Sequence, residues 1–333
     1  MLPAYLALFA TLGSASDPVR LTGTGSTFIY PILAKWIREY TMLHPDIEVF
    51  YEPTGSGRGI SRSLAGLVDF GASDGPVGNQ QLQNAKVRIL HLPVTLGAVV
   101  PAYNVPGVTG ELRFTGEALA GIFLGKVKKW NDPLLARANP HAALPNREIH
   151  IVYRADSSGT TYVWADYLSK ISPEWNKQMG HGTQIPFPVG AAAQYNEGVV
   201  QAIKETRYSL GYLQLTYAVE SHTAYGRVEN ANGVFVRAED ASITAAAAAT
   251  ATTMPDDFRI SITNAADADA YPISSFTWLL VPAKMDDPEK KKALIGFLRW
   301  VLTKGQTMAT PLNYAPLPGD VALKVLAAVD RIH

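Results

Sequence analysis

Cysteine is absent from the 333-residue sequence. The chain therefore predicts no disulfide bond, zinc–thiolate site, cysteine nucleophile or lipid on cysteine. An excess of one charge is absent too, because 29 Lys and Arg balance 29 Asp and Glu. No overall basic field indicates binding to nucleic acid or to an anionic membrane. Beyond the N-terminus, no apolar run is long enough to cross a bilayer as a helix.

Residues 1–16 resemble a secretory signal segment. The apolar stretch Leu2–Leu12 is followed by the small residues Gly-Ser-Ala-Ser and then by Asp17. Such a segment is too short to span a bilayer as a helix. It lacks the usual positively charged start, and a buried N-terminal segment is the alternative. We therefore expect an exported protein whose folded part begins at residue 17.

The remaining sequence has the length of about two domains and the pattern of an α/β fold. From Val19 onward, predicted strands alternate with helices, and the strands end in glycine-rich or polar turns. The first predicted helix has apolar residues at helical spacing: Ile29, Ile32, Leu33, Trp36, Ile37 and Tyr40. Other predicted elements are a helix starting at Thr115, one capped by Ser172, a hairpin over 228–236, a helix over 241–253, an amphipathic helix with Leu294, Phe297, Leu298 and Val301 on one face, and a last helix that Asp320 could cap.

Four polar turns at strand ends carry the residues of chemical interest. Helix N-termini have unpaired N–H groups, hydroxyl residues add donors, and an arginine fork matches an oxyanion. The sequence therefore predicts a cage for a tetrahedral oxyanion, although each turn alone could be a plain helix cap. The residues are Thr27 and Phe28 in the first turn, Ser56 in the second, Asp74 in the third, and Arg154, Asp156, Ser158, Gly159 and Thr160 in the fourth.

Asp74 is unexpected in an anion site, because a carboxylate repels an anion. It is explained if the ligand keeps a proton: hydrogen phosphate has a P–OH donor, and an ionised Asp can only accept. Sulfate would leave that carboxylate without a partner. A site that requires a hydrogen-bond partner can reject the analogue lacking it by roughly four to five decades. Asp74 therefore favours phosphate over sulfate, with a helix N-cap as its ordinary alternative.

Competing motifs fit less well. The stretch GTGSTF resembles a dinucleotide-binding turn, but Phe28 replaces its third glycine. The stretch GASDG matches the nucleophile elbow of serine hydrolases, which would make Ser73 the nucleophile. The seven histidines show no metal-ligand spacing. We therefore expect no catalytic residue, no cofactor and no metal, and keep a secreted serine hydrolase using Ser73 as the less favoured alternative.

Together the turns resemble one family, the periplasmic phosphate-binding proteins of the phosphate-specific ABC transport system. The matching stretches include LTGTGSTFIYPILAKW, TGSGRGI, VDFGASDGPV, RADSSGTTYVWADYLSKISPEW, YNEGVVQAIKET and YPISSFTWLLV, and they span about residues 20–305 in order. The resemblance implies a two-domain periplasmic-binding-protein fold (type II-like), each domain a mixed sheet flanked by helices. Domain one would comprise 17–95 and 272–333, and domain two 96–271.

The resemblance also implies site roles. Phosphate would bind in the cleft between the domains to Thr27, Phe28, Ser56, Asp74, Arg154, Ser158, Gly159 and Thr160, with Asp156 orienting Arg154. The implied function is high-affinity phosphate binding by a soluble, monomeric periplasmic protein that delivers phosphate to an ABC permease. A receptor for arsenate or sulfate is the alternative within this class. Arg58 adds a charge to a turn that is usually neutral, and it either steers phosphate or faces solvent.

Overall fold

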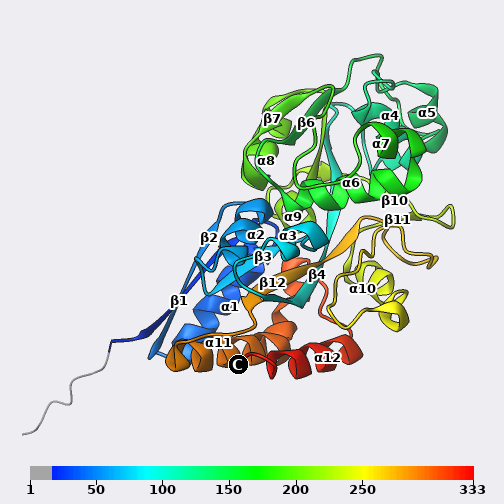
Figure 1. Cartoon of the computed structure of the whole chain (residues 1–333). Helices are drawn as coiled ribbons and strands as arrows, with labels where there is room; N and C mark the ends of the chain where they lie inside the picture. Colours follow the sequence, from blue (N-terminus) through cyan, green and yellow to red (C-terminus); the bar gives the residue numbers. More distant parts are fainter. Residues whose placement is uncertain (1–16) are drawn as a thin grey trace, which may run out of the picture.

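The computed structural model describes residues 17–333, so the predicted signal segment lies outside the described residues (Figure 1). Most strands join one sheet path in the order β2-β1-β3-β12-β4-β8-β6-β7, and β9 also pairs with β4. A smaller sheet has the order β11-β10-β5. The strands are β1 (Val19–Gly25), β2 (Ile47–Pro53), β3 (Phe70–Ser73), β4 (Ile89–Asn104), β5 (Arg113–Phe114), β6 (His150–Arg154), β7 (Ala191–Ala193), β8 (Ser209–Gln214), β9 (Ala224–Tyr225), β10 (Arg227–Glu229), β11 (Phe235–Val236) and β12 (Ser274–Pro282).

Two lobes are visible in Figure 1. We call the lobe around β1, β2, β3 and β12 lobe one, and the lobe around β6, β7 and β8 lobe two. The part of the large sheet in each lobe mixes parallel and antiparallel pairs. In lobe one, β1 pairs parallel with β3, whereas β12 pairs antiparallel with β3. In lobe two, β6 is parallel to β8, and β8 is antiparallel to β4. The predicted α/β class with mixed sheets is confirmed.

Strand β4 belongs to both lobes. Its first part, up to Ala98, pairs with β12, and its second part, from Val99, pairs with β8. The change of partner occurs between adjacent residues, so β4 crosses between the lobes as one extended strand. It is apolar and almost entirely buried along its length, as expected for a strand covered on both faces.

Helices flank both sheets. Those of lobe one are α1 (Tyr30–Leu43), α2 (Ser56–Leu64), α3 (Asn79–Gln83), α11 (Pro288–Thr303) and α12 (Gly319–Val329). Those of lobe two are α4 (Gly116–Phe123), α5 (Pro133–Ala138), α6 (Gly159–Ile171), α7 (Pro173–Gln178), α8 (Tyr195–Glu205) and α9 (Leu215–Glu220). Helix α10 (Asp240–Ala248) packs against β4 and β12. The predicted domain boundaries at residues 95 and 271 remain predictions.

The predicted core faces are buried, and a few local predictions are corrected. The first helix buries Ile32, Leu33, Trp36 and Tyr40, and Tyr40 packs edge-on against Phe297 of α11 at 5.2 Å between ring centroids. The alanine-rich helix ends at Ala248, and a short 3-10 turn follows. Asp320 does not cap α12, because the helix starts one residue earlier, after Pro318. In residues 17–333, no helix combines the length and the apolar character that a membrane span needs.

Candidate functional site

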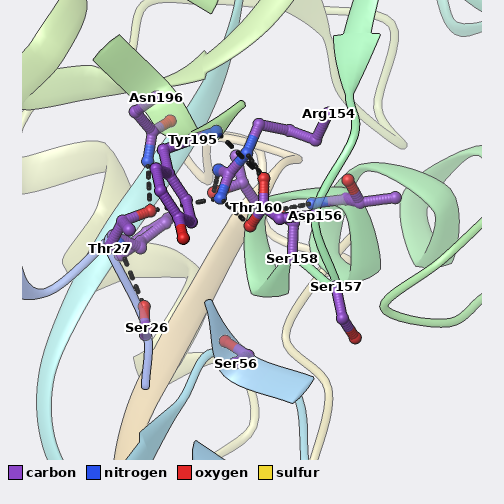
Figure 2. Close-up of polar contacts among 12 residues, drawn as sticks. Ser26, Thr27, Ser56, Arg154, Asp156, Ser157, Ser158, Thr160, Tyr195 and Asn196 are labelled. Carbon is purple, nitrogen blue, oxygen red and sulfur yellow. Dashed lines mark hydrogen bonds and ion pairs between the residues drawn. The ribbon is translucent and has the colours of Figure 1, made fainter. Parts of the chain in front are cut away.

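The predicted site residues lie together between the lobes, near the carboxyl ends of β1, β3 and β6. Figure 2 shows part of this group: Thr27, Ser56, Arg154, Asp156, Ser158 and Thr160. Strand β1 leads into the turn with Thr27 and Phe28, β3 ends directly before Asp74, and β6 ends at Arg154. Ser56 starts α2, so it is a helical residue rather than a turn residue as expected. Apart from Asp156, which is partly buried, the predicted residues are buried. This placement is typical of ligand sites in α/β folds.

Arg154 is the cationic centre of the site. Its Nε and Nη2 donate to the two carboxylate oxygens of Asp156 at 2.7 and 2.6 Å, which is a bidentate pair. Its Nη1 donates to the Thr160 hydroxyl at 3.1 Å, and its Nη2 also donates to the Thr27 hydroxyl at 3.2 Å. Asp156 is itself held by the Tyr195 backbone N–H at 3.0 Å. Asp156 thus fixes two N–H groups of Arg154, and its role in orienting Arg154 toward a ligand remains a prediction.

Asp74 is a buried carboxylate surrounded by hydroxyl donors. Ser26 and Ser56 donate to Oδ2 at 2.5 and 3.2 Å, and Thr277 donates to Oδ1 at 2.6 Å. Burial raises the pKa of Asp74 to about 6, although these hydrogen bonds and the charge of Arg154 oppose the rise. Above this pKa the ionised carboxylate can only accept hydrogen bonds, whereas below it the protonated carboxyl group can also donate one.

The two lobes meet closely at glycines. A Cβ atom at Gly159 would lie 2.2 Å from Asp74 Oδ2 and 2.3 Å from Ser56 Oγ. A Cβ atom at Gly57 would lie 1.9 Å from Ser157 Oγ, and the Gly57 N–H donates to the Ser157 carbonyl at 3.0 Å. The start of α6 in lobe two is thus in contact with Asp74 and α2 in lobe one only because these positions have no side chain.

The start of α6 offers donors to an anion. Ser158 caps the helix, because its hydroxyl accepts from the Thr161 N–H at 3.1 Å. Gly159 and Thr160 follow as the first helical residues, whose N–H groups have no partner within the helix. The Ser158 N–H donates to the Thr183 carbonyl at 2.7 Å, so Ser158 offers its hydroxyl rather than its amide. The positive end of the α6 dipole faces the same region.

Several residues of this network were missing from the sequence prediction. Ser26 and Thr277 donate hydrogen bonds to Asp74. Asn196 donates to the Thr27 hydroxyl at 3.0 Å, and the Tyr217 hydroxyl donates to the Thr27 carbonyl at 2.8 Å. Asn196 and Thr277 lie in matching stretches of the resembled family, so those stretches were the available signal. Their contacts depend on tertiary structure and could not be read from spacing.

Ser73 does not have the surroundings of a nucleophile. Its hydroxyl donates to the Gly75 carbonyl at 2.6 Å and also accepts from the Gly75 N–H. Within residues 17–333, no histidine is hydrogen-bonded to it, so a general base is missing from its contacts. Arg58 is exposed. The described part of the chain contains no cluster of three or more His, Asp or Glu that could hold a metal ion.

Comparison with known proteins identifies the family. A family model described as a PBP superfamily domain matches residues 12–304. The phosphate-binding protein PstS of Pasteurella multocida is 38% identical over 321 residues, which cover 96% of this chain and 92% of that protein. This chain belongs to the PstS phosphate-binding proteins. PstS of Methanocaldococcus jannaschii is also 38% identical, over 93% of this chain and 85% of its own length.

Solved structures agree with the PstS assignment at the level of the fold. A high affinity periplasmic phosphate-binding protein (PfluDING) with bound phosphate superimposes with a TM-score of 0.72 at 19% identity, covering 94% of this chain and 93% of that chain. A human phosphate binding apolipoprotein gives a TM-score of 0.73 at 19% identity, covering 92% and 93%. The predicted two-domain periplasmic-binding-protein fold is confirmed.

Proposed function

We propose that this protein binds one inorganic phosphate ion between its lobes and delivers it to the membrane permease of an ABC importer. The proposal places the protein in the periplasm, as a receptor without catalytic activity. Its relatives are named phosphate-binding proteins, and the PfluDING structure holds phosphate. The family is therefore the first support, and the chemistry of the site is the second.

The choice of ligand rests on one observation in the site, which is that the buried carboxylate of Asp74 lies among hydrogen-bond donors. Arg154, the hydroxyls of Thr27, Ser158 and Thr160, and the start of α6 all favour an anion, whereas the Ser56 hydroxyl donates to Asp74. The Asp74 carboxylate disfavours an anion unless that anion has a proton to donate. Hydrogen phosphate and hydrogen arsenate meet this requirement near neutral pH, whereas sulfate does not. The proposed ligand is therefore a protonated tetrahedral oxyanion, with phosphate first.

Closure of the lobes would complete the site. The proposed ligand groups come from both lobes: Thr27, Phe28, Ser56 and Asp74 from lobe one, and Arg154, Ser158, Gly159 and Thr160 from lobe two. An anion that contacts both sets binds the closed state more tightly than an open one and so shifts the population toward closure. We propose that residues 17–95 and 272–333 move as one unit against 96–271, with β4 among the connections.

Titration calorimetry of the ligand-stripped protein with phosphate, and with sulfate as control anion, tests the proposal. We expect one phosphate per chain with micromolar affinity or better, about −8 kcal/mol or beyond, and no sulfate heat. Asp74→Asn should weaken phosphate binding and raise the affinity for sulfate, because the amide can donate to a fully ionised anion. Asp69→Asn is a matched control: Asp69 lies just before the other end of β3, where it accepts from Thr22 and Lys290. Unchanged phosphate-over-sulfate selectivity in Asp74→Asn would refute the proton-acceptor role.

A further inference from the structure

The side chain of Asn196, at the start of α8, has a defined orientation. Its Oδ1 accepts from the Gln214 backbone N–H at 3.3 Å. A backbone N–H can only donate, so the oxygen of the amide must face Gln214, and the NH₂ group must face the other way. That NH₂ group lies 3.0 Å from the Thr27 hydroxyl and donates to it across the lobe interface (Figure 2). Asn196 is completely buried, so no solvent competes for these bonds.

The hydrogen bond from Asn196 limits the Thr27 hydroxyl to the role of a donor toward any further partner. A hydroxyl has two acceptor positions and one proton to donate. Both acceptor positions are used, because Arg154 Nη2 donates to Thr27 Oγ1 at 3.2 Å and Asn196 Nδ2 donates at 3.0 Å. Within residues 17–333, Thr27 Oγ1 donates to no protein acceptor. Its proton is therefore not used by a described protein acceptor, and a ligand that takes this proton must itself be an acceptor.

The residue before Asn196, Tyr195, has an unusual backbone conformation that helps to hold the site. Tyr195 has φ 57°, in the left-handed region that a bulky residue rarely adopts and that is energetically costly. In this conformation the Tyr195 N–H bonds Asp156, the partner of Arg154, while the next side chain bonds Thr27. Two consecutive residues thus act on both sides of the proposed anion site, because Tyr195 holds Asp156, the partner of Arg154, and Asn196 holds Thr27 directly.

We propose that Asn196 is a positioning residue for phosphate recognition, which keeps the Thr27 hydroxyl as an obligate hydrogen-bond donor to the anion. The inference rests on the proposed function. Asn196 itself need not touch phosphate, because it acts by occupying an acceptor position of Thr27. Residue 196 therefore contributes to affinity only when a hydroxyl is present at position 27.

A double-mutant cycle tests this coupling by phosphate titration. Thr27→Val removes the hydroxyl at nearly constant volume and should weaken binding about ten- to a hundred-fold, the range for a hydrogen bond to a charged group. Asn196→Leu should also weaken binding in the wild-type background, but it should have no effect in the Thr27→Val background. Asn196→Ala replaces Asn196→Leu if the latter does not fold. An equal loss in both backgrounds would overturn the proposal, since Asn196 would then act on the fold or on phosphate directly.

Asn196→Asp separates the donor role from simple packing. The new carboxylate can still accept from Gln214 N–H, so unfolding should be less affected than by Asn196→Leu, but it would also accept the Thr27 proton and repel the anion. We expect Asn196→Asp to be the more damaging change for phosphate affinity and Asn196→Leu the more damaging for thermal unfolding. If affinity simply follows stability in this pair, the inference fails. If the wild-type protein shows no phosphate heat, the proposed function fails instead.

Discussion

Replacing Asp74 by Asn should increasingly stabilise the ligand-free protein, relative to wild type, as the pH rises from 4 to 7, although it damages the proposed site. Burial raises the pKa of Asp74 to about 6, from its ordinary value of 3.8. Each pH unit of difference corresponds to about 1.36 kcal/mol, so ionised Asp74 costs the folded state about 3 kcal/mol. Asn carries no such cost, because it does not ionise.

The pH dependence of this effect has a defined sign. Between pH 4 and 6 the folded protein retains the Asp74 proton while the unfolded chain loses it, so the unfolding free energy contributed by this group falls as the pH rises. Below pH 4 the group contributes no penalty, and above pH 6 the full penalty is present. The stability of Asp74→Asn relative to wild type should therefore increase by about 3 kcal/mol from pH 4 to pH 7.

Urea unfolding of both proteins across this pH range, in buffers free of phosphate and arsenate, measures the difference. Only its change with pH is diagnostic, because lost or rearranged bonds to Ser26, Ser56 and Thr277 add an offset that does not depend on pH. The Asp69→Asn variant serves as a control for a carboxylate-to-amide change outside the site. A stability difference that stays flat from pH 4 to 7, or falls, would refute the argument that Asp74 ionises at a cost in the empty site.

Two further substitutions test the contact between the lobes and the alternative function. Gly57→Ala should weaken phosphate binding by about 1–3 kcal/mol, the usual cost of overpacking, because the added Cβ would lie 1.9 Å from Ser157 Oγ and 2.4 Å from Ser157 Cβ. Adding Ser157→Gly to this variant should restore the affinity. Calorimetry that shows no such rescue would contradict the overpacking explanation. Ser73→Ala should lower the unfolding free energy by about 1 kcal/mol through loss of the hydrogen bond to Gly75, and it should leave the phosphate affinity unchanged. If the wild-type protein hydrolysed a chromogenic ester and this variant did not, the alternative function as a serine hydrolase would be supported.

The sequence was informative where a local rule determines the structure. Helical spacing predicted the buried face of α1, and Ser172 caps α7 as expected, with its hydroxyl accepting from the Trp175 N–H. The Asn-Gly pair predicted the hairpin of β10 and β11, whose strands pair antiparallel. The strand-end rule predicted that Thr27 and Asp74 would lie close together, because the turns after the neighbouring strands β1 and β3 meet at one edge of the sheet. Arg154 follows β6 in lobe two and reaches Thr27 from the opposite lobe, so this rule does not explain its position.

Features that depend on distant parts of the chain could not be predicted in this way. Thr277 lies in the middle of β12, where it looked like an ordinary strand residue, and it reaches Asp74 only because β12 pairs beside β3. The raised pKa of Asp74 follows from burial by both lobes, which no local pattern encodes. The orientation of Asn196 depends on the Gln214 N–H at the end of β8, a strand that follows α8 in sequence.

The position of β12 has a consequence for the order of folding. Strand β12 lies between β3 and β4 in the sheet, yet all of lobe two is inserted between β4 and β12 in the sequence. During synthesis from the N-terminus, β1, β2 and β3 emerge first, but the inner edge of β3 has no partner until Ser274–Pro282 has been made. Such long-range pairing is slow, and an unpaired strand edge is prone to association. The sheet of lobe one can therefore be completed only after the segment from Ser274 has been synthesised, although β1, β2 and β3 precede it by about two hundred residues.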